Sequence, residues 1–298
     1  MARIDCGPAS TGVSDRLADD VFGGSAARVK REFTSIELTG AGTDRERYLR
    51  VKEVFDYVLA AVLFVLTLPL LLVSMALVKM TSRGPAIYSQ SRVGLRGRTF
   101  PIYKLRSMRN DCERLTGPKW STEKDPRVTL VGRFLRRTHL DELPQLCNVL
   151  RGEMSLIGPR PERPEFVREL EKAIPLYRAR EQARPGVTGL AQVQLPPDTE
   201  VASVRRKLAC DLFYLGNLDP WLDLRILLST AMKVVGVPCG FSCRVLGIPT
   251  GSIIQKDYEE LVALSLGGQA AGLSEEVPRR AQGWLRESDS DRGLAWGD

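Results

Sequence analysis

A run of 22 residues without a charge, 57–78, constrains this chain more than any other part of its sequence. At the rise of an α-helix, such a run reaches across the hydrocarbon core of a bilayer, which is about 30 Å thick. A long polar and charged segment precedes it, which is not the arrangement of a cleavable signal peptide. We therefore predict a membrane-bound protein with its membrane helix in residues 46–82.

Pro69 lies near the middle of the run and is expected to bend it. Proline removes one backbone hydrogen bond, and its ring clashes with the carbonyl group four residues earlier. Thr67 could bond back onto the preceding turn. Two topologies stay open: a helix broken at Pro69 that enters one leaflet and returns, and a kinked helix that spans the bilayer. The positive-inside rule does not separate them, because basic residues flank both ends: Arg45, Arg47, Arg50, Lys52, Lys79 and Arg83.

The composition indicates a folded, basic protein. Hydrophobic residues make up 43% of the 298 residues, which is enough for a packed core. The net charge of +7 suggests an anionic partner such as a phosphorylated small molecule, a phospholipid headgroup or nucleic acid. The six cysteines are scattered, as is typical of reduced thiols facing the cytosol. At the close pair Cys239 and Cys243 we expect small thiols rather than a zinc site, because the chain has a single histidine.

The sequence divides into four parts. Residues 1–45 are predicted to form a flexible leader, 46–82 the membrane helix and 83–240 a cytoplasmic domain. Residues 241–298 form a C-terminal extension that is predicted to be largely disordered from about residue 267, where polar residues dominate.

Local patterns predict an α-dominated mixed α/β fold for the cytoplasmic domain. Glycine-rich turn signals separate two β-prone pieces, 86–90 and 99–105, which suggest a hairpin. Helical spacing follows in four segments: 130–150, 163–181, 204–218 and 221–237. The last segment has an apolar face but carries charges, so we expect an amphipathic helix that lies in the membrane interface or caps the core.

Asp141 and Glu142 stand side by side in RRTHLDELPQL, directly after a group of arginines. Thr138 and Asp141 have capping-box spacing and Pro144 suits a first helical turn, so Thr138 or Asp141 is expected to cap a helix. At that position the helix dipole would keep Asp141 ionised. An ionised aspartate among arginines could attack phosphorus, hold Mg²⁺ on a diphosphate, or do both. The alternative is a helix cap with solvated ion pairs.

Several ordered blocks between residues 51 and 235 carry a family resemblance. They are FDYVLAAVLFVLTLPLLL, SRGPAIYSQSRVGLRGRTFPIYKLRSM, DPRVTLVGRFLRRTHLDELPQLCNVLRGEMSLIGPRPERPEF and RPGVTGLAQV. Together they resemble the bacterial sugar transferases that are monotopic phosphoglycosyl transferases, of the exopolysaccharide and O-antigen initiating type. The resemblance implies transfer of a sugar 1-phosphate from a UDP-sugar to polyprenyl (undecaprenyl) phosphate, giving polyprenyl-diphosphosugar and UMP with Mg²⁺. It also implies a re-entrant helix in the bacterial inner membrane and a catalytic domain facing the cytoplasm, and it leaves a homodimer open.

The resemblance also implies roles for individual residues. Asp141 would attack the β-phosphorus, carry the phosphosugar covalently and contact the metal, and Glu142 would assist proton transfer or organise the metal. The candidates for phosphate binding are Arg136, Arg137, Arg160, Lys104 and Arg106. For Lys104 and Arg106, a solvated strand edge is an equally good reading of the sequence.

Two residues depart from the family pattern. Leu68 precedes Pro69 where the family has a serine, which leaves the proline alone to impose the turn. His139 stands where a small hydroxyl residue is usual, and we expect an exposed residue there rather than a catalytic base.

Two rival functions stay open at the level of sequence. A membrane-anchored basic scaffold would bind nucleic acid or anionic lipid without chemistry, but aromatic residues make up only 7% and no RNA-type stacking motif is present. We therefore expect no nucleic-acid partner. An ordinary glycosyltransferase would form a glycosidic bond and release UDP instead of UMP.

Overall fold

The computed structural model describes residues 42–110, 112, 125–196, 201–249 and 251–265. Most of the predicted leader and the tail predicted to be disordered from residue 267 lie outside the described residues. Within the described part, helices predominate, as predicted, and two small sheets complete the fold.

The apolar run forms one long helix, α2, which extends over Gly42–Thr81 and so begins four residues before the predicted boundary. Its segment Glu46–Thr81 contains an 18-residue window with a mean hydropathy of 2.7, and it is the one helix of the described chain that is long and apolar enough to cross a membrane. Only 17% of its most apolar window is buried in the protein. Most of its surface is therefore free to meet lipid.

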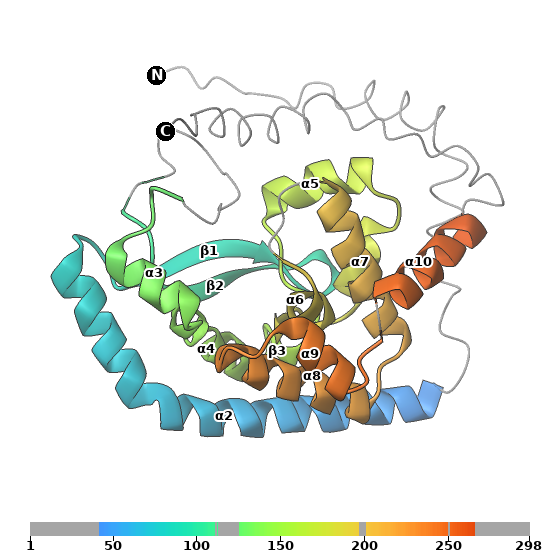
Figure 1. Ribbon diagram of the computed structural model, residues 1–298, viewed down its shortest axis with the longest axis horizontal. Coiled ribbons are helices and arrows are strands. Elements are labelled where there is room, and N and C mark those ends of the chain that lie inside the picture. Colours follow the sequence, from blue (N-terminus) through green and yellow to red (C-terminus); the bar gives the residue numbers. More distant parts are fainter. Residues whose placement is uncertain (1–41, 111, 113–124, 197–200, 250, 266–298) are drawn as a thin grey trace, which may run out of the picture.

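Pro69 bends α2 without ending it. Figure 1 shows the helix running along the lower side of the molecule and then turning upward towards α3. The Thr67 hydroxyl donates to the Leu63 carbonyl at 2.7 Å, as the sequence predicts. The carbonyl that Pro69 leaves without its usual donor is that of Val65. Thr67 bonds the carbonyl two residues before it, that of Leu63, and so does not replace the lost bond.

Polar contacts attach both ends of α2 to the rest of the fold. Near the start, Lys52 lies 3.0 Å from Asp223 of α8 (Pro220–Val234) and 3.4 Å from Asp56. Hydroxyl groups complete this cluster, and we call its six residues the α2 clamp: Tyr48, Lys52, Asp56, Ser155, Tyr214 and Asp223. At the other end, Arg106 donates to the carbonyl groups of Ser82 and Arg83.

The predicted hairpin is confirmed. Strands β1 (Ile87–Val93) and β2 (Thr99–Leu105) pair antiparallel with Ile87 opposite Leu105, and the short turn η1 (Leu95–Gly97) joins them. A second, parallel pair joins β3 (Ser155–Ile157) to β4 (Gly186–Thr188), and the sequence analysis did not predict it. Each of these strands has only three residues, too few for a periodic pattern to emerge.

The segment 130–150 is helical in part, as its spacing predicts, but no helix begins at Thr138 or Asp141. The chain forms α3 (Leu130–Arg137), the single turn η2 (Leu140–Glu142) and α4 (Gln145–Leu150). Helix α3 ends because His139 adopts a left-handed conformation, with φ 56°. Thr138 therefore does not cap a following helix; its hydroxyl donates back to the carbonyl groups of Phe134 and Leu135 at the end of α3.

The predicted helix at 163–181 is likewise divided, into α5 (Pro164–Ala173) and η3 (Tyr177–Gln182). The helix predicted at 204–218 is α7 (Val201–Gly216), and that at 221–237 is α8. The remaining described helices are α6 (Leu190–Gln194), α9 (Cys239–Val245) and α10 (Gly251–Ser265).

One main core joins these elements. It includes Leu208 of α7 and Ile226 of α8, each fully buried, together with Ile254 and Tyr258 of α10. The described part of the C-terminal extension thus packs on the preceding domain: α10 lies against α7, and α9 against α8 and α6 (Figure 1).

Candidate functional site

The turn η2 brings Asp141 and Glu142 beside the end of the hairpin. The left-handed residue His139 redirects the chain after α3, and η2 then packs against β2. Asp141 is 8% exposed, whereas its neighbours in the turn, Leu140 and Glu142, are half-buried. His139 is exposed, as predicted. The geometry places the acidic pair at a junction of separate segments rather than on one helix.

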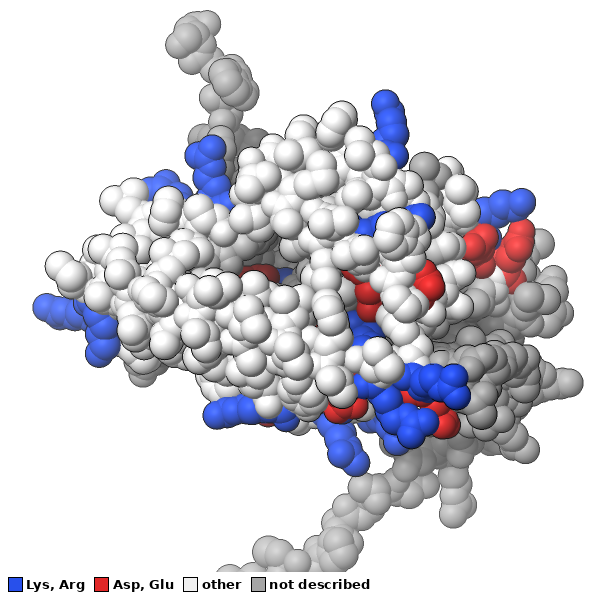
Figure 2. All heavy atoms as spheres, turned by 90° about the horizontal axis from the view of Figure 1, so that it is seen from below, with Lys and Arg blue, Asp and Glu red and all other residues white. Residues whose placement is uncertain are grey.

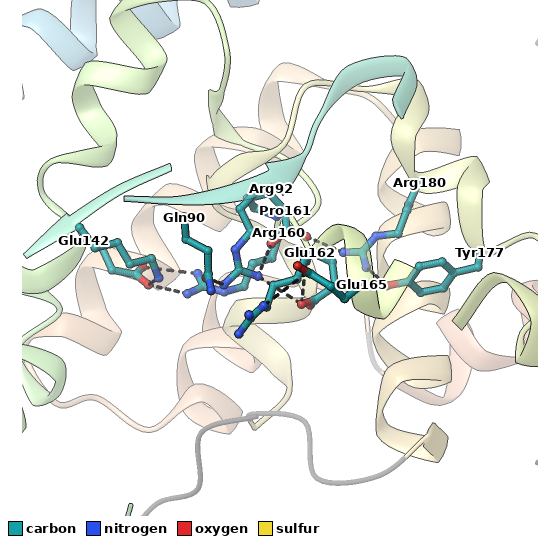
Figure 3. A network of polar contacts seen from close by, with 11 residues as sticks. Gln90, Arg92, Glu142, Arg160, Pro161, Glu162, Glu165, Tyr177 and Arg180 are labelled. Atoms are coloured by element: carbon teal, nitrogen blue, oxygen red, sulfur yellow. Dashed lines mark hydrogen bonds and ion pairs between the residues drawn. The ribbon is translucent and has the colours of Figure 1, made fainter. Parts of the chain in front are cut away.

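Glu142 is held by two cations. Lys104 of β2 donates to its Oε1 at 2.9 Å, and the Arg160 guanidinium contacts both of its carboxylate oxygens. Figure 3 shows the Glu142 and Arg160 side chains pointing toward each other. Burial by itself would raise the pKa of Glu142, but the charges and hydrogen bonds of Arg160 and Lys104 hold it well below its usual range. Glu142 is therefore an ionised anchor for two cations.

Asp141 differs from its neighbour in having no hydrogen bond or ion pair within the described part of the chain. Burial and the adjacent Glu142 charge raise the pKa of its carboxyl group, while Lys104, Arg136 and Arg160 act in the opposite direction. The expectation that a helix N-terminus keeps Asp141 ionised is wrong in its cause, because Asp141 lies inside η2 and caps no helix. The Asp141 carboxylate is therefore buried and close to positive charge, and no described residue binds it.

The five predicted phosphate-binding residues fall into two groups. The charges of Lys104, Arg136 and Arg160 lower the pKa of Asp141, so these three lie near the acidic pair. The Arg136 Nε–H donates to the Ser107 hydroxyl at 2.8 Å. Arg137 is exposed. Arg106 is 4% exposed, and its guanidinium binds the carbonyl groups of Ser82 and Arg83 directly after α2, so it fixes the chain where it leaves that helix. The phosphate contacts themselves stay predictions.

A chain of charged groups continues from Arg160 into the protein (Figure 3). The Arg180 side chain donates to the Arg160 carbonyl at 2.8 Å and forms an ion pair with Asp211 at 2.8 Å. Nearby, Arg92 of β1 contacts Glu162 at 3.2 Å. Arg160 is thus fixed through its own backbone and through its neighbours, and its side chain remains 40% exposed.

The backbone of the GPRP block is packed against the RPG block without room for side chains. The Gly158 N–H donates to the Thr188 carbonyl, and the Gly186 N–H donates to the Pro159 carbonyl, both at 2.9 Å. A Cβ atom built on Gly158 would lie 2.4 Å from the Arg184 carbonyl oxygen, closer than atoms can approach. This crossing sets the position of Arg160.

Sequence reasoning missed Ser107 and the α2 clamp. A signal for the clamp was present, since Lys52 and Asp56 stand four residues apart at the start of the apolar run and such a pair shares one helix face. Their partners, Ser155 and Asp223, lie far along the sequence and carried no signal.

These features, an apolar surface helix and an acidic pair set among cations, suit an enzyme that acts on an anionic substrate at a membrane. The model of the bacterial sugar transferase family matches residues 47–237. The chain therefore belongs to this family.

Among curated relatives, the chain is similar to the UDP-glucose:undecaprenyl-phosphate glucose-1-phosphate transferases of Xanthomonas campestris pv. campestris and Caulobacter vibrioides. Identity is 37% over 239 residues to the first, covering 79% of this chain and 49% of the relative, and 49% over 188 residues to the second, covering 62% and 69%. It is also 40% identical over 217 residues to the UDP-N-acetylgalactosamine-undecaprenyl-phosphate N-acetylgalactosaminephosphotransferase of Aeromonas hydrophila, covering 73% and 50%. The chain spans about half the length of the first and the last of these relatives.

Proposed function

We propose that the protein transfers a sugar 1-phosphate from a UDP-sugar to undecaprenyl phosphate, with Asp141 as the covalent nucleophile. The observation that carries the proposal is the contrast inside the acidic pair: Glu142 is bound by Lys104 and Arg160, whereas Asp141 is buried next to the same cations without a partner among the described residues. The names of the relatives supply the two substrate classes.

The chemistry takes two displacements at the same phosphorus atom. A carboxylate oxygen of Asp141 forms a bond to the β-phosphorus of the donor, and the bond from that phosphorus to the bridging oxygen breaks, so UMP leaves with the electron pair. A phosphate oxygen of the lipid acceptor then attacks the same phosphorus and releases the Asp141 carboxylate. The donor, acceptor and products carry the same total charge, so no proton has to move.

This balance favours a positioning role for Glu142. A carboxylate whose pKa lies well below its usual range is a poor proton carrier at neutral pH. Through Lys104 and Arg160 it holds two cations in place, and these offset the repulsion between Asp141 and an anionic donor. Of the two roles predicted from the family resemblance, proton transfer is the less consistent with this geometry.

We further propose Mg²⁺ as the cofactor, shared with the donor. The described residues contain no group of three or more acidic, histidine or cysteine side chains that would form a complete cage. Mg²⁺ commonly binds one or two carboxylates together with substrate phosphates, and the unpaired Asp141 carboxylate fits such a site. When bound, the ion would neutralise charge that develops on the diphosphate.

A bacterial inner-membrane location, with both ends of α2 on the cytoplasmic side, completes the proposal. The α2 clamp ties the start of the helix to α8 and β3, and Arg106 ties its end to the hairpin, so both ends are attached to one folded body. The 12 residues after Pro69 are about 18 Å long as a helix and too short to cross a bilayer core. Cysteines introduced at Arg47 and Lys79 should both react with an impermeant reagent from the same side; opposite-side labelling would mean a full span.

The test of the chemistry is isotope exchange. Labelled UMP should enter the UDP-sugar pool when the purified protein, Mg²⁺ and donor are present without acceptor, because the first displacement is reversible. UDP-glucose and UDP-N-acetylgalactosamine are the first donors to try, each scored by UMP release once undecaprenyl phosphate is added. Exchange that requires the acceptor would mean direct transfer, and release of UDP would mean an ordinary glycosyltransferase.

A further inference from the structure

Helix α8 carries an apolar stripe that no other described element covers. Trp221, Leu224 and Leu228 are 58%, 41% and 45% exposed, and Val235, directly after the helix, is 77% exposed. Their spacing of three, four and seven residues places them on one helix face. The opposite face is buried and includes Asp223 of the α2 clamp. The orientation of the stripe is thus fixed relative to α2.

Helix α9 continues this stripe and lies beyond the family match, which ends at residue 237. Phe241 and Val245, four residues apart, are 59% and 60% exposed. Between them Ser242 is fully buried, and its hydroxyl lies 3.0 Å from that of Ser229 in α8. The contact fastens the polar side of α9 to α8 and leaves its aromatic and aliphatic side chains outward.

The two helices lie along the lower side of the molecule, where α2 also runs (Figure 1). Seen from that side, the surface is mostly uncharged, and the Lys and Arg side chains lie mainly near its edges, with Asp and Glu side chains beside some of them (Figure 2). Arg244 of α9 is exposed, and the Arg225 guanidinium lies 5.3 Å from the centre of the Trp221 ring. An apolar plane with aromatic residues and a basic margin matches the boundary between acyl chains and anionic headgroups.

We propose that α9 docks into the headgroup–acyl boundary of a bilayer containing anionic lipid, beside the stripe of α8, for which an interfacial position is one of the two predictions from the sequence. This inference rests on the membrane attachment through α2 that forms part of the proposed function, and it adds a contact outside the matched family region. The membrane is favoured over a second copy of the chain as the occupant, because the plane is continuous with α2, whose apolar surface is itself mostly unburied.

The experiment places a fluorescent reporter on α9 and measures its depth. Phe241→Trp puts an indole in the middle of the proposed contact, and Ile253→Trp provides a matched control on α10, where the native side chain is 53% exposed. Both full-length variants are reconstituted in nanodiscs of phosphatidylethanolamine and phosphatidylglycerol, with and without bromine on the upper part of the acyl chains. The spectrum of the parent protein is subtracted from each.

Most of the added fluorescence at residue 241 should be lost with brominated lipid and be protected from aqueous iodide, and residue 253 should behave in the opposite way. Equal behaviour of the two positions would overturn the proposal. Protection from iodide without bromine quenching would also overturn it, in favour of a contact between two copies. Because depth is measured without turnover, a failure here is distinct from a failure of UMP exchange.

Discussion

Two buried clusters of this protein contain the same ingredients and use them differently. The α2 clamp and the acidic pair each combine two carboxylates with a lysine. In the clamp, both carboxylates share Lys52 and accept hydrogen bonds from Tyr48, Tyr214 and Ser155. In the acidic pair, one carboxylate takes both cations and the other has no partner within the described chain. The clamp joins elements, whereas the acidic pair leaves Asp141 available.

The difference shows how a structural charge cluster can be told from a functional one. An ionised group inside a protein costs free energy unless it is paired, so folding alone favours arrangements such as the clamp. An unpaired buried carboxylate is expected where a ligand completes it. The four experiments below test this contrast.

The largest effect is expected for Asp141→Asn. Loss of the proposed nucleophile should reduce transfer by about 10³-fold or more and abolish UMP exchange. Stability should stay equal or rise: the raised pKa means that ionised Asp141 costs folding free energy above its unfolded pKa, and a neutral amide removes that cost. Steady-state rates and thermal unfolding measure both. Asp257→Asn on the exposed face of α10 is the control. A marked drop in melting temperature would make Asp141 a structural residue like those of the clamp.

Lys52→Met should produce the reverse pattern. It leaves Asp56 and Asp223 as neighbouring buried charges without their shared cation, which costs about 3–5 kcal/mol of folding free energy. The melting temperature should fall, while the protein that remains folded should still exchange UMP. Lys256→Met provides a control, since Lys256 is 77% exposed on α10. If stability did not change, the clamp would not be the fastening that its geometry indicates.

Glu142→Gln sharpens the contrast inside the acidic pair. Lys104 and Arg160 lose their common anchor, and a displacement of such groups lowers the rate by about 10²-fold. Removing the Glu142 charge also removes a cause of the raised Asp141 pKa. Asp141 then ionises at lower pH, so the acidic limb of the pH–rate profile should shift toward lower pH. Glu169→Gln on α5 is the control, and an unmoved limb would contradict the electrostatic link.

The smallest effect is expected for Ser107→Ala. The Arg136 Nε–H loses an acceptor at 2.8 Å, a contact of about 1 kcal/mol, which corresponds to less than a tenfold change in rate. A rise in the KM for the donor with little change in kcat would indicate that Arg136 binds ground-state phosphate. Ser91→Ala, on the exposed side of β1, is the matched control. A loss as large as that of Glu142→Gln would place Arg136 in the transition state.

The sequence predicted the parts of this site that are encoded locally. Glycine turns mark the hairpin, and the LDELPQL and GPRP blocks carry the acidic pair and Arg160. Within 130–150 a helix start was expected at Thr138 or Asp141. The separate turn η2 was missed because apolar periodicity continues across His139, whose left-handed conformation no side-chain pattern reveals. The pairing of Glu142 with Arg160 and Lys104, and of Lys52 with Asp223, depends on tertiary packing between residues far apart in the chain.

The Arg160 side chain binds Glu142 on one side and faces solvent on the other. One edge of its guanidinium holds Glu142, its backbone is fixed where two glycine-containing segments cross, and 40% of its side chain faces solvent. A phosphate that reaches this cation finds it already oriented, so little rotational freedom is lost on arrival. For the proposed contact with a substrate phosphate, the cation is therefore organised once, during folding, before any substrate arrives.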